Sequence, residues 1–249
     1  DLVRLGTTAT AEEITDTAVT QPLVVASALL AFEEIASRGL FPEDAIVAGH
    51  SVGELAAAAI AGVISSDDAV SLAAVRGAAM AKACALEPTG MSAVLGGDEA
   101  AVLARLEELD LAPANVNAVG QIVAAGLLTK LAELAESAPE KARVRALPVA
   151  GAFHTKFMAS AGDTVAAAAA AITPSEPTRT LLSNSDGQPV ASGADALNKL
   201  AAQVTRPVRW DLCNAYLRTA QVTGLVELPP AGALVGIAKR ELRGVANLG

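Results

Sequence analysis

The sequence is poor in aromatic side chains, with a single Trp and a single Tyr among its 249 residues. Its hydrophobic share of 52% comes instead largely from alanine and aliphatic residues. Charged residues make up only 18% of the chain, so an intrinsically disordered protein is not expected. This composition favours a helix-rich, tightly packed α/β protein over a β-sandwich or an aromatic binding surface.

Positive charge and cysteine are also scarce. The net charge is −9, and because phosphate binding requires a basic face, nucleic acid is not expected as a partner. Cys84 and Cys213 lie far apart and give neither a disulfide framework nor a metal site. No signal peptide is visible, and the longest uncharged run, 111–129, contains Pro113 and polar amides that a transmembrane helix would have to bury in lipid. We therefore expect a cytoplasmic protein with no membrane partner.

The middle of the chain differs from its two ends. Strands are predicted at 91–97, 115–117, 122–125 and 143–149, with helices at 98–109 and 127–137. This βαββαβ order is the ferredoxin-like pattern. We interpret residues 89–148 as a ferredoxin-like subdomain.

The flanking segments, 1–88 and 149–249, are interpreted as one large domain with an α/β-hydrolase-like fold and a parallel sheet. Hydrophobic periodicity and the residues typical of helix ends predict their elements. The expected helices lie at 20–38, 52–62, 67–84, 164–172 and 210–220, and the expected strands at 45–49, 180–183 and 222–228.

The segment Gly49-His50-Ser51-Val52-Gly53 matches the nucleophile-elbow pattern G-x-S-x-G. A serine on a tight strand-to-helix turn is forced outward, and a glycine on each side is expected to let the backbone crowd without Cβ clashes. The following helix presents free N–H groups and a positive dipole end to a developing oxyanion. The pattern is weak alone, but here it follows a predicted strand and precedes a predicted helix. Ser51 is therefore the candidate nucleophile.

A serine hydroxyl needs a base to attack at neutral pH. The chain contains only two histidines. His50 adjoins Ser51, and adjacent side chains on such a turn diverge. His154 is therefore the candidate general base, although a lone histidine more often simply packs in a turn. No acid that would complete a triad is evident.

Several segments together resemble the malonyl-CoA:acyl-carrier-protein transacylase family of fatty-acid and polyketide synthesis. Residues 49–54, GHSVGE, resemble its GHSxGE nucleophile motif, and residues 151–154, GAFH, resemble its xAFH histidine motif. The other matching segments are TQP at 20–22, RGxxM at 76–80, NxN…Q at 115–121 and Q…PVxW at 203–210. The likeness runs in family order from about residue 20 to residue 240.

The resemblance implies a role for each matched residue. Ser51 would carry the acyl group as an ester, and His154 would deprotonate Ser51 and later the incoming thiol. The backbone carbonyl of Gln203 would orient His154 in place of an aspartate, and the backbone N–H of Val52 would donate to the oxyanion. Arg76 would grip the free carboxylate of malonyl in a bidentate pair.

Three further residues are candidates for substrate binding. In this family a Phe before the catalytic histidine goes with malonyl and a Ser with methylmalonyl, so Phe153 implies malonyl. Val52, where methylmalonyl enzymes tend to have Gln, implies the same choice. Met80 is expected to line the acyl pocket or to fill the core. Asn117 is expected to bind the substrate or its pantetheine arm, or to close a turn.

The implied function is ping-pong transfer of malonyl from malonyl-CoA to the phosphopantetheine thiol of acyl carrier protein, with no metal or bound cofactor, in a cleft between the two domains. One alternative is a serine hydrolase or thioesterase that uses water, which would have no need of Arg76. The other is a non-catalytic carrier-protein docking module. It stays open because no segment matches the family's N-terminal GQGxQ, whose Gln completes the oxyanion hole, and losing one such donor costs about 10²–10³ in rate. We expect residues to precede Asp1.

Overall fold

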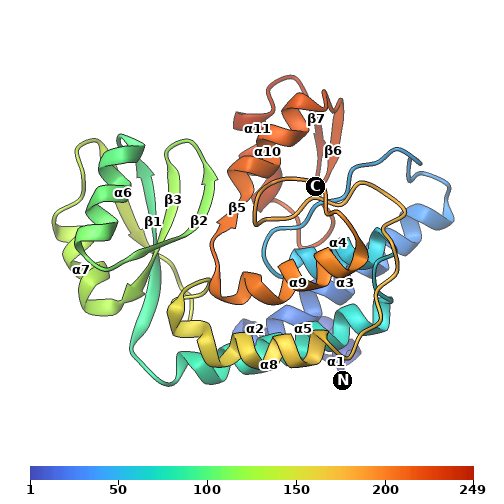
Figure 1. Cartoon of the computed structure of the whole chain (residues 1–249), viewed down its shortest axis with the longest axis horizontal. Coiled ribbons are helices and arrows are strands. Elements are labelled where there is room, and N and C mark those ends of the chain that lie inside the picture. The colour runs from blue at the N-terminus through green and yellow to red at the C-terminus, as the bar shows by residue number, and fades with distance from the viewer.

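The computed structural model describes residues 1–249 as a mixed α/β protein (Figure 1). Two short 3₁₀ helices, Lys156–Met158 and Gln203–Thr205, accompany the regular elements. The α-helices are α1 (Leu2–Thr7), α2 (Ala11–Thr15), α3 (Thr17–Ser37), α4 (Gly53–Ile60), α5 (Ser66–Cys84), α6 (Glu99–Glu108), α7 (Leu128–Glu136), α8 (Ala159–Ala169), α9 (Gly193–Ala202), α10 (Trp210–Thr219) and α11 (Ala233–Glu241). The strands are β1 (Thr89–Gly96), β2 (Ala112–Ala118), β3 (Gln121–Leu127), β4 (Ala142–Ala146), β5 (Val208–Arg209), β6 (Gly224–Val226) and β7 (Ala246–Leu248).

A five-stranded sheet of order β4-β1-β3-β2-β5 forms one side of the molecule (Figure 1). Four of its strands come from one continuous segment and pair antiparallel, in the chain order β1, α6, β2, β3, α7, β4. Helices α6 and α7 bury Leu106 and Leu134 against Val94 and Ile122 of the sheet. Strand β5 comes from a distant part of the chain and adds parallel to β2, so the sheet is joined to the rest of the molecule.

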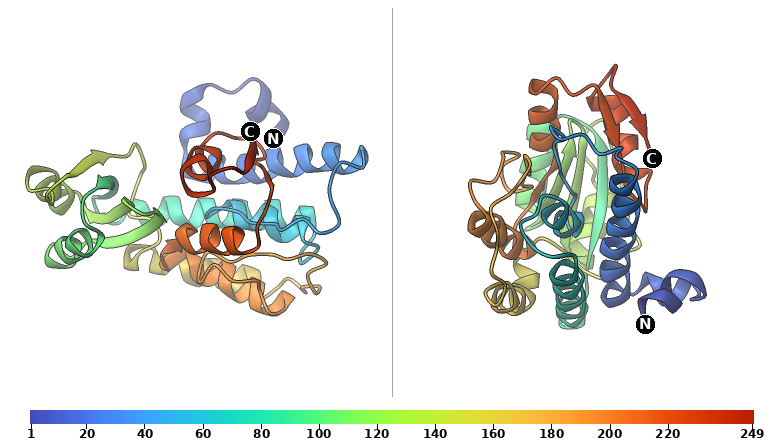
Figure 2. Two further views of the ribbon diagram at one scale, coloured as in Figure 1. Left: turned by 90° about the horizontal axis from the view of Figure 1, so that it is seen from above. Right: turned by 90° about the vertical axis from the view of Figure 1, so that its right-hand side faces the viewer.

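The other side of the molecule is mainly helical, and the views in Figures 1 and 2 show α3, α5 and α8 running along it. Helix α5 packs against α3, α4 and α8. Alanines fill much of this core, which allows the helices to approach closely. At Gly77 of α5, an added Cβ would lie 2.7 Å from the carbonyl oxygen of Thr17, so only glycine permits this contact between α5 and α3.

Helix α3 is the one helix that is long and apolar enough to cross a membrane by length and composition. This is weak evidence for a span, because a core helix passes the same test. Val25, Ala28 and Leu29 of α3 belong to the core that α3 shares with α4 and α5. The structure therefore uses α3 as a packing helix.

The outer segments do not form the one parallel sheet that was predicted: β6 and β7 make a separate two-stranded sheet, and the runs 45–49 and 180–183 share only a single bridge, between Val47 and Leu181. Two hydrogen bonds make this bridge, from the Val47 N–H to the Thr180 carbonyl and from the Leu182 N–H to the Val47 carbonyl. The two runs then diverge: the first turns sharply at Ser51, and the second folds back on itself through a bridge between Leu182 and Pro189. The strand predicted at 222–228 is present as β6, paired in parallel with β7.

Candidate active site

Ser51 lies on the turn between the Val47 bridge and α4, with a φ of 54°. This left-handed conformation costs a non-glycine residue about 1–3 kcal/mol and is found at functional sites. A Cβ at Gly49 would lie 2.1 Å from the carbonyl carbon and oxygen of Gly53, so residue 49 must be glycine. A Cβ at Gly53 would meet nothing within 4 Å, so the expectation that both glycines relieve Cβ clashes holds only for Gly49.

His154 lies beside Ser51 although 103 positions separate them in the chain. Its Nε2 atom is 2.8 Å from Ser51 Oγ, and its Nδ1 atom is 2.8 Å from the backbone carbonyl oxygen of Gln203. A carbonyl oxygen only accepts, so Nδ1 bears the proton and Nε2 presents its lone pair to the Ser51 hydroxyl. The structure therefore brings together the three residues that the sequence singled out, in a geometry suited to proton transfer from Ser51.

The backbone N–H of Val52 follows the nucleophile and donates to no acceptor in the protein. Val52 is the residue that precedes α4, and the dipole of that helix makes its N-terminus favourable for a negative charge. The next three N–H groups, from Gly53 to Leu55, already donate to backbone carbonyls. The neighbouring N–H of Ser51 is already used, because it donates to Asn184 Oδ1 at 2.8 Å. Of these two amides, the Val52 N–H is the one available to an oxyanion.

Arg76 reaches the nucleophile from the middle of α5. It is 3% exposed, and its Nη2 atom donates to Ser51 Oγ at 3.1 Å. The guanidinium also donates to the side-chain oxygens of Gln21, at 2.6 Å, and Gln203, at 3.1 Å. No carboxylate oxygen lies within ion-pair distance of it, whereas buried charges in proteins are normally paired. A buried cation beside a nucleophile is therefore equipped to receive an anionic group.

A buried polar network that the sequence analysis missed supports these residues. Asn184 is fully buried, and its side chain accepts from the Ser51 N–H and donates to the Gly49 carbonyl at 2.8 Å, so it holds both sides of the turn. Its own N–H donates to Glu54 Oε1 at 2.6 Å, and Gln203 Nε2 donates to Glu54 Oε2. The sequence signals were the last residue of GHSVGE, which is Glu54, and the Gln of TQP, which is the Gln21 that contacts Arg76.

Burial dominates the protonation of the site. It lowers the pKa of His154 to about 3, assisted by the positive charge of Arg76, and it lowers the pKa of Arg76 to about 10. Burial also raises the pKa of Glu54 to about 8, against the opposing effects of the Asn184 N–H and Arg76. His154 is consequently a neutral imidazole, the form that can accept a proton.

This depressed pKa gives a prediction for the free protein. The rate at which a neutral fluorophosphonate probe labels Ser51 should show no acid limb near pH 6.5, the ordinary value for histidine, because His154 stays unprotonated well below it. Arg76→Met removes a cation that lowers the pKa of His154, so any acid limb should move to higher pH. Labelling followed by mass spectrometry, with circular dichroism to verify folding at each pH, measures both. A wild-type limb centred at pH 6.5 would contradict the burial argument.

The same shift affects stability with a definite sign. Below about pH 6.5 the His154 side chain binds a proton in the unfolded chain but not in the folded one. The contribution of His154 to the free energy of unfolding is therefore fully present above pH 6.5. It is lost as the pH falls from 6.5 through about 3.

The remaining candidates surround this centre. The side-chain oxygen of Asn117 in β2 accepts from His50 Nε2 at 2.8 Å, so His50 is hydrogen-bonded to the sheet and not to Ser51. Met80 is 1% exposed, and its Sδ accepts from Gln21 Nε2 at 3.4 Å. Phe153 is half-buried and packs against the helical core and against the inner face of the sheet.

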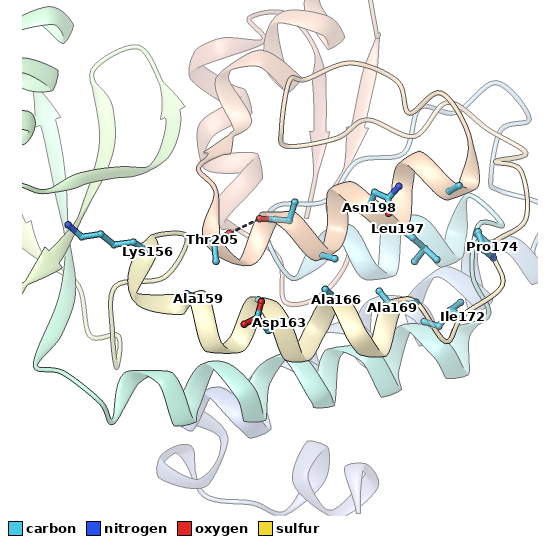
Figure 3. Close-up of a pocket in the computed structure, with 15 residues that line it drawn as sticks. Lys156, Ala159, Asp163, Ala166, Ala169, Ile172, Pro174, Leu197, Asn198 and Thr205 are labelled. Atoms are coloured by element: carbon cyan, nitrogen blue, oxygen red, sulfur yellow. Dashed lines mark hydrogen bonds between the residues drawn. The ribbon is translucent and has the colours of Figure 1, made fainter.

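A separate hollow of about 670 Å³ lies between α8 and α9 (Figure 3). Its walls are mostly alanines and other apolar side chains of these two helices, with Lys156 and Asp163 among its few polar groups. Lys156 is already paired with Asp110. Neither Ser51 and His154 nor Arg76 and Gln203 line this hollow, so the candidate chemistry lies elsewhere.

Comparisons with known proteins agree with this geometry. The family model described as "Acyl transferase domain" matches residues 4–248. A malonyl CoA-acyl carrier protein transacylase from Mycolicibacterium smegmatis is 72% identical over 248 residues, which cover 98% of this chain and 86% of the relative. The crystal structure of MCAT from Mycobacterium tuberculosis superposes with a TM-score of 0.97 at 69% identity, covering 100% of this chain and 82% of that chain.

A second similar structure is a type II PKS acyl-carrier protein in complex with its malonyl-transacylase. It has a TM-score of 0.93 at 27% identity and covers 99% of this chain and 82% of that chain. These comparisons confirm the resemblance drawn from the motifs: the chain belongs to the acyl transferase family, among the malonyl CoA-acyl carrier protein transacylases.

Proposed function

We propose that this protein transfers a malonyl group from malonyl-CoA to the phosphopantetheine thiol of acyl carrier protein, through a seryl ester on Ser51. The observation that supports this best is Arg76, a buried guanidinium without an ion-pair partner that donates to the nucleophilic oxygen. The free carboxylate of malonyl would supply its missing counter-charge. The names of the relatives point to the same substrate and acceptor.

In the first half-reaction, His154 Nε2 takes the proton of Ser51 Oγ as that oxygen attacks the thioester carbonyl of malonyl-CoA. The negative charge that forms on the carbonyl oxygen is stabilised by the Val52 N–H. The C–S bond then breaks, the malonyl ester remains on Ser51, and His154 returns its proton to the sulfur of CoA. The Gln203 carbonyl holds the imidazole through Nδ1 at every stage.

The second half-reaction runs in reverse order. His154 removes the proton of the phosphopantetheine thiol, the sulfur attacks the seryl ester, and the Ser51 Oγ–acyl bond breaks as His154 returns the proton to Ser51. All groups used are side chains or backbone of this chain, so the proposal includes no metal or bound cofactor.

Selection of malonyl is assigned to the residues around Arg76. A guanidinium can bind a carboxylate through two parallel N–H bonds, which fixes both the charge and the orientation of the substrate. Phe153 would crowd a substituent on the C2 carbon, and Met80 and Asn117 would line the acyl and pantetheine sides. A serine hydrolase has no use for such a buried cation, which disfavours water as the normal acceptor.

The fold carries finer proposals. The chain order and sheet order of β1–β4 support a ferredoxin-like subdomain at 89–148. The elbow at Ser51 supports an α/β-hydrolase-like large domain of 1–88 and 149–249, with the active site between the two. The free thiols of Cys84 and Cys213 fit a reducing cytoplasm.

Transfer is tested by mixing the protein with malonyl-CoA and phosphopantetheinylated carrier protein, and weighing all species by mass spectrometry. Malonyl-carrier protein is expected to accumulate much faster than free malonate. Methylmalonyl-CoA is expected to react about 5–150-fold more slowly, since overpacking by one methyl group costs about 1–3 kcal/mol. Phe153→Ser should reduce this difference in rate. Hydrolysis that outpaces transfer would make the protein a hydrolase, and no adduct at all would favour a docking module.

A further inference from the structure

Glu54 is a buried carboxylate to which the proposed mechanism assigns no step. It lies in the first turn of α4 and is 5% exposed. One oxygen accepts the Asn184 N–H at 2.6 Å, and the other accepts from Gln203 Nε2. Both oxygens therefore face N–H donors, the pattern of an ionised carboxylate, which is the form of Glu54 above its raised pKa of about 8.

The Gln203 side chain lies between Glu54 and Arg76. Its Nε2 points to the carboxylate of Glu54, and its Oε1 accepts from Arg76 Nη2 at 3.1 Å. An ionised carboxylate only accepts and a guanidinium only donates, so only one of the two amide orientations satisfies both neighbours. Glu54 therefore favours the orientation in which Oε1 faces Arg76, and the Asn184 side-chain oxygen, 3.3 Å from Gln203 Nε2, favours the same one.

This orientation matters because Arg76 has few other restraints. Its guanidinium is held by the Gln203 and Gln21 side-chain oxygens, and the same Nη2 that meets Gln203 also donates to Ser51 Oγ. If the Gln203 amide were reversed, its NH₂ group would face the guanidinium as a second donor. The guanidinium would then be pushed away from its position beside the nucleophile.

We propose that Glu54 is a positioning residue for malonyl recognition: its carboxylate orients the side-chain amide of Gln203, which in turn holds Arg76 beside Ser51. The inference rests on the proposed malonyl transfer and deepens it. Glu54 also has a second role: it accepts the Asn184 N–H, and the Asn184 side chain holds the backbone at Gly49 and Ser51. The test must separate the effect of Glu54 on the Gln203 amide from its effect on the nucleophile turn.

Glu54→Gln keeps the shape of the side chain at position 54 and is expected to reverse the side-chain amide of Gln203. Its oxygen must still accept the Asn184 N–H, so its NH₂ group meets the NH₂ group of Gln203, which turns over. Two rates are measured for the wild type and the variant at about pH 9, above the raised pKa of Glu54. One is acylation by malonyl-CoA, whose carboxylate Arg76 would bind. The other is labelling by an uncharged fluorophosphonate, which offers Arg76 no carboxylate and reports the reactivity of Ser51.

The ratio of malonyl acylation to fluorophosphonate labelling is expected to fall at least about tenfold in Glu54→Gln, the effect of losing a hydrogen bond to a charged group. The KM for malonyl-CoA should rise. A ratio unchanged within about twofold, with both rates reduced, would overturn the proposal and leave Glu54 as a support of the turn only. Absence of a malonyl adduct on the wild type would instead refute the proposed function.

A second comparison tests whether the effect of Glu54 passes through the Gln203 amide. Gln203→Leu removes the side-chain amide and keeps the backbone carbonyl that holds His154. In that background, Glu54 keeps its bond from the Asn184 N–H but has lost the Gln203 donor, so adding Glu54→Gln should leave the ratio unchanged, because no Gln203 amide remains to orient. A further fall of the ratio in the double variant would show that Glu54 acts on Arg76 by another route, and would overturn the proposal.

Discussion

Ser51→Ala is expected to abolish the malonyl adduct and to reduce transfer to the carrier protein at least about 10⁴-fold, as losses of nucleophilic serines do. The substitution removes the oxygen that lies 2.8 Å from His154 Nε2 and 3.1 Å from Arg76 Nη2. No other hydroxyl contacts His154, so no neighbouring group can replace it. Intact-protein mass spectrometry after brief exposure to malonyl-CoA measures the adduct directly.

A matched control is Ser160→Ala, which makes the same change at an exposed position on α8 and should keep the wild-type adduct. Both variants should be compared by thermal unfolding, because Ser51 has a left-handed backbone and its substitution also affects stability. A folded Ser51→Ala protein that still gains the mass of a malonyl group would remove Ser51 as the acyl carrier.

Much of the fold could be predicted from the sequence where local periodicity decides it. Helices α5, α6 and α10 were expected at nearly their observed bounds, since their apolar residues recur on a helical period. Side-chain caps also mark the starts of α5 and α6, at Ser65 and Asp98. Helices α9 and α11 were missed, because each begins at or beside a glycine that reads as a turn. Their starts are fixed by side chains: Ser192 accepts from the Asp195 N–H, and Glu227 accepts from the first turn of α11 across a loop.

Strand pairing was less predictable, because it depends on partners far away in the chain. The run 45–49 has the length and composition of a strand, yet it makes only the bridge from Val47 to Leu181. Strand β5 is two residues long and could not be recognised locally, but it adds to β2 through Val208 and Arg209. Neither outcome follows from periodicity, which carries no information about register between distant segments.

Some residues of the candidate site could likewise be predicted from the sequence and others could not. Ser51 and His154 were found because a nucleophile needs a particular turn and a base, and the chain has few bases to offer. Asn184 was missed because it follows a predicted strand and precedes a turn, where an Asn is ordinary. Its contacts with Gly49 and Ser51 span more than 130 positions and become visible only in the folded chain.

Arg76→Met is expected to reduce the rate of malonyl acylation about 10²–10³-fold, the effect of removing one partner of a buried charge pair. Labelling of Ser51 by an uncharged fluorophosphonate should change less than about tenfold, because the bonds of His154 to Ser51 and Gln203 do not involve Arg76. The two rates together separate carboxylate recognition from nucleophile reactivity.

Arg76→Lys keeps the positive charge but removes the parallel N–H groups of the guanidinium, so it separates the effect of charge from that of geometry. The ammonium of lysine cannot hold Gln21 and Gln203 while presenting two parallel N–H groups to a carboxylate, so it should recover only a small part of the malonyl rate. Arg38→Met, at an exposed position after α3, is the matched control and should behave as the wild type. If malonyl-CoA acylates the Arg76→Met variant at the wild-type rate, Ser51 would still be the nucleophile. The reason for assigning a dicarboxylic acyl group to this site would then be lost.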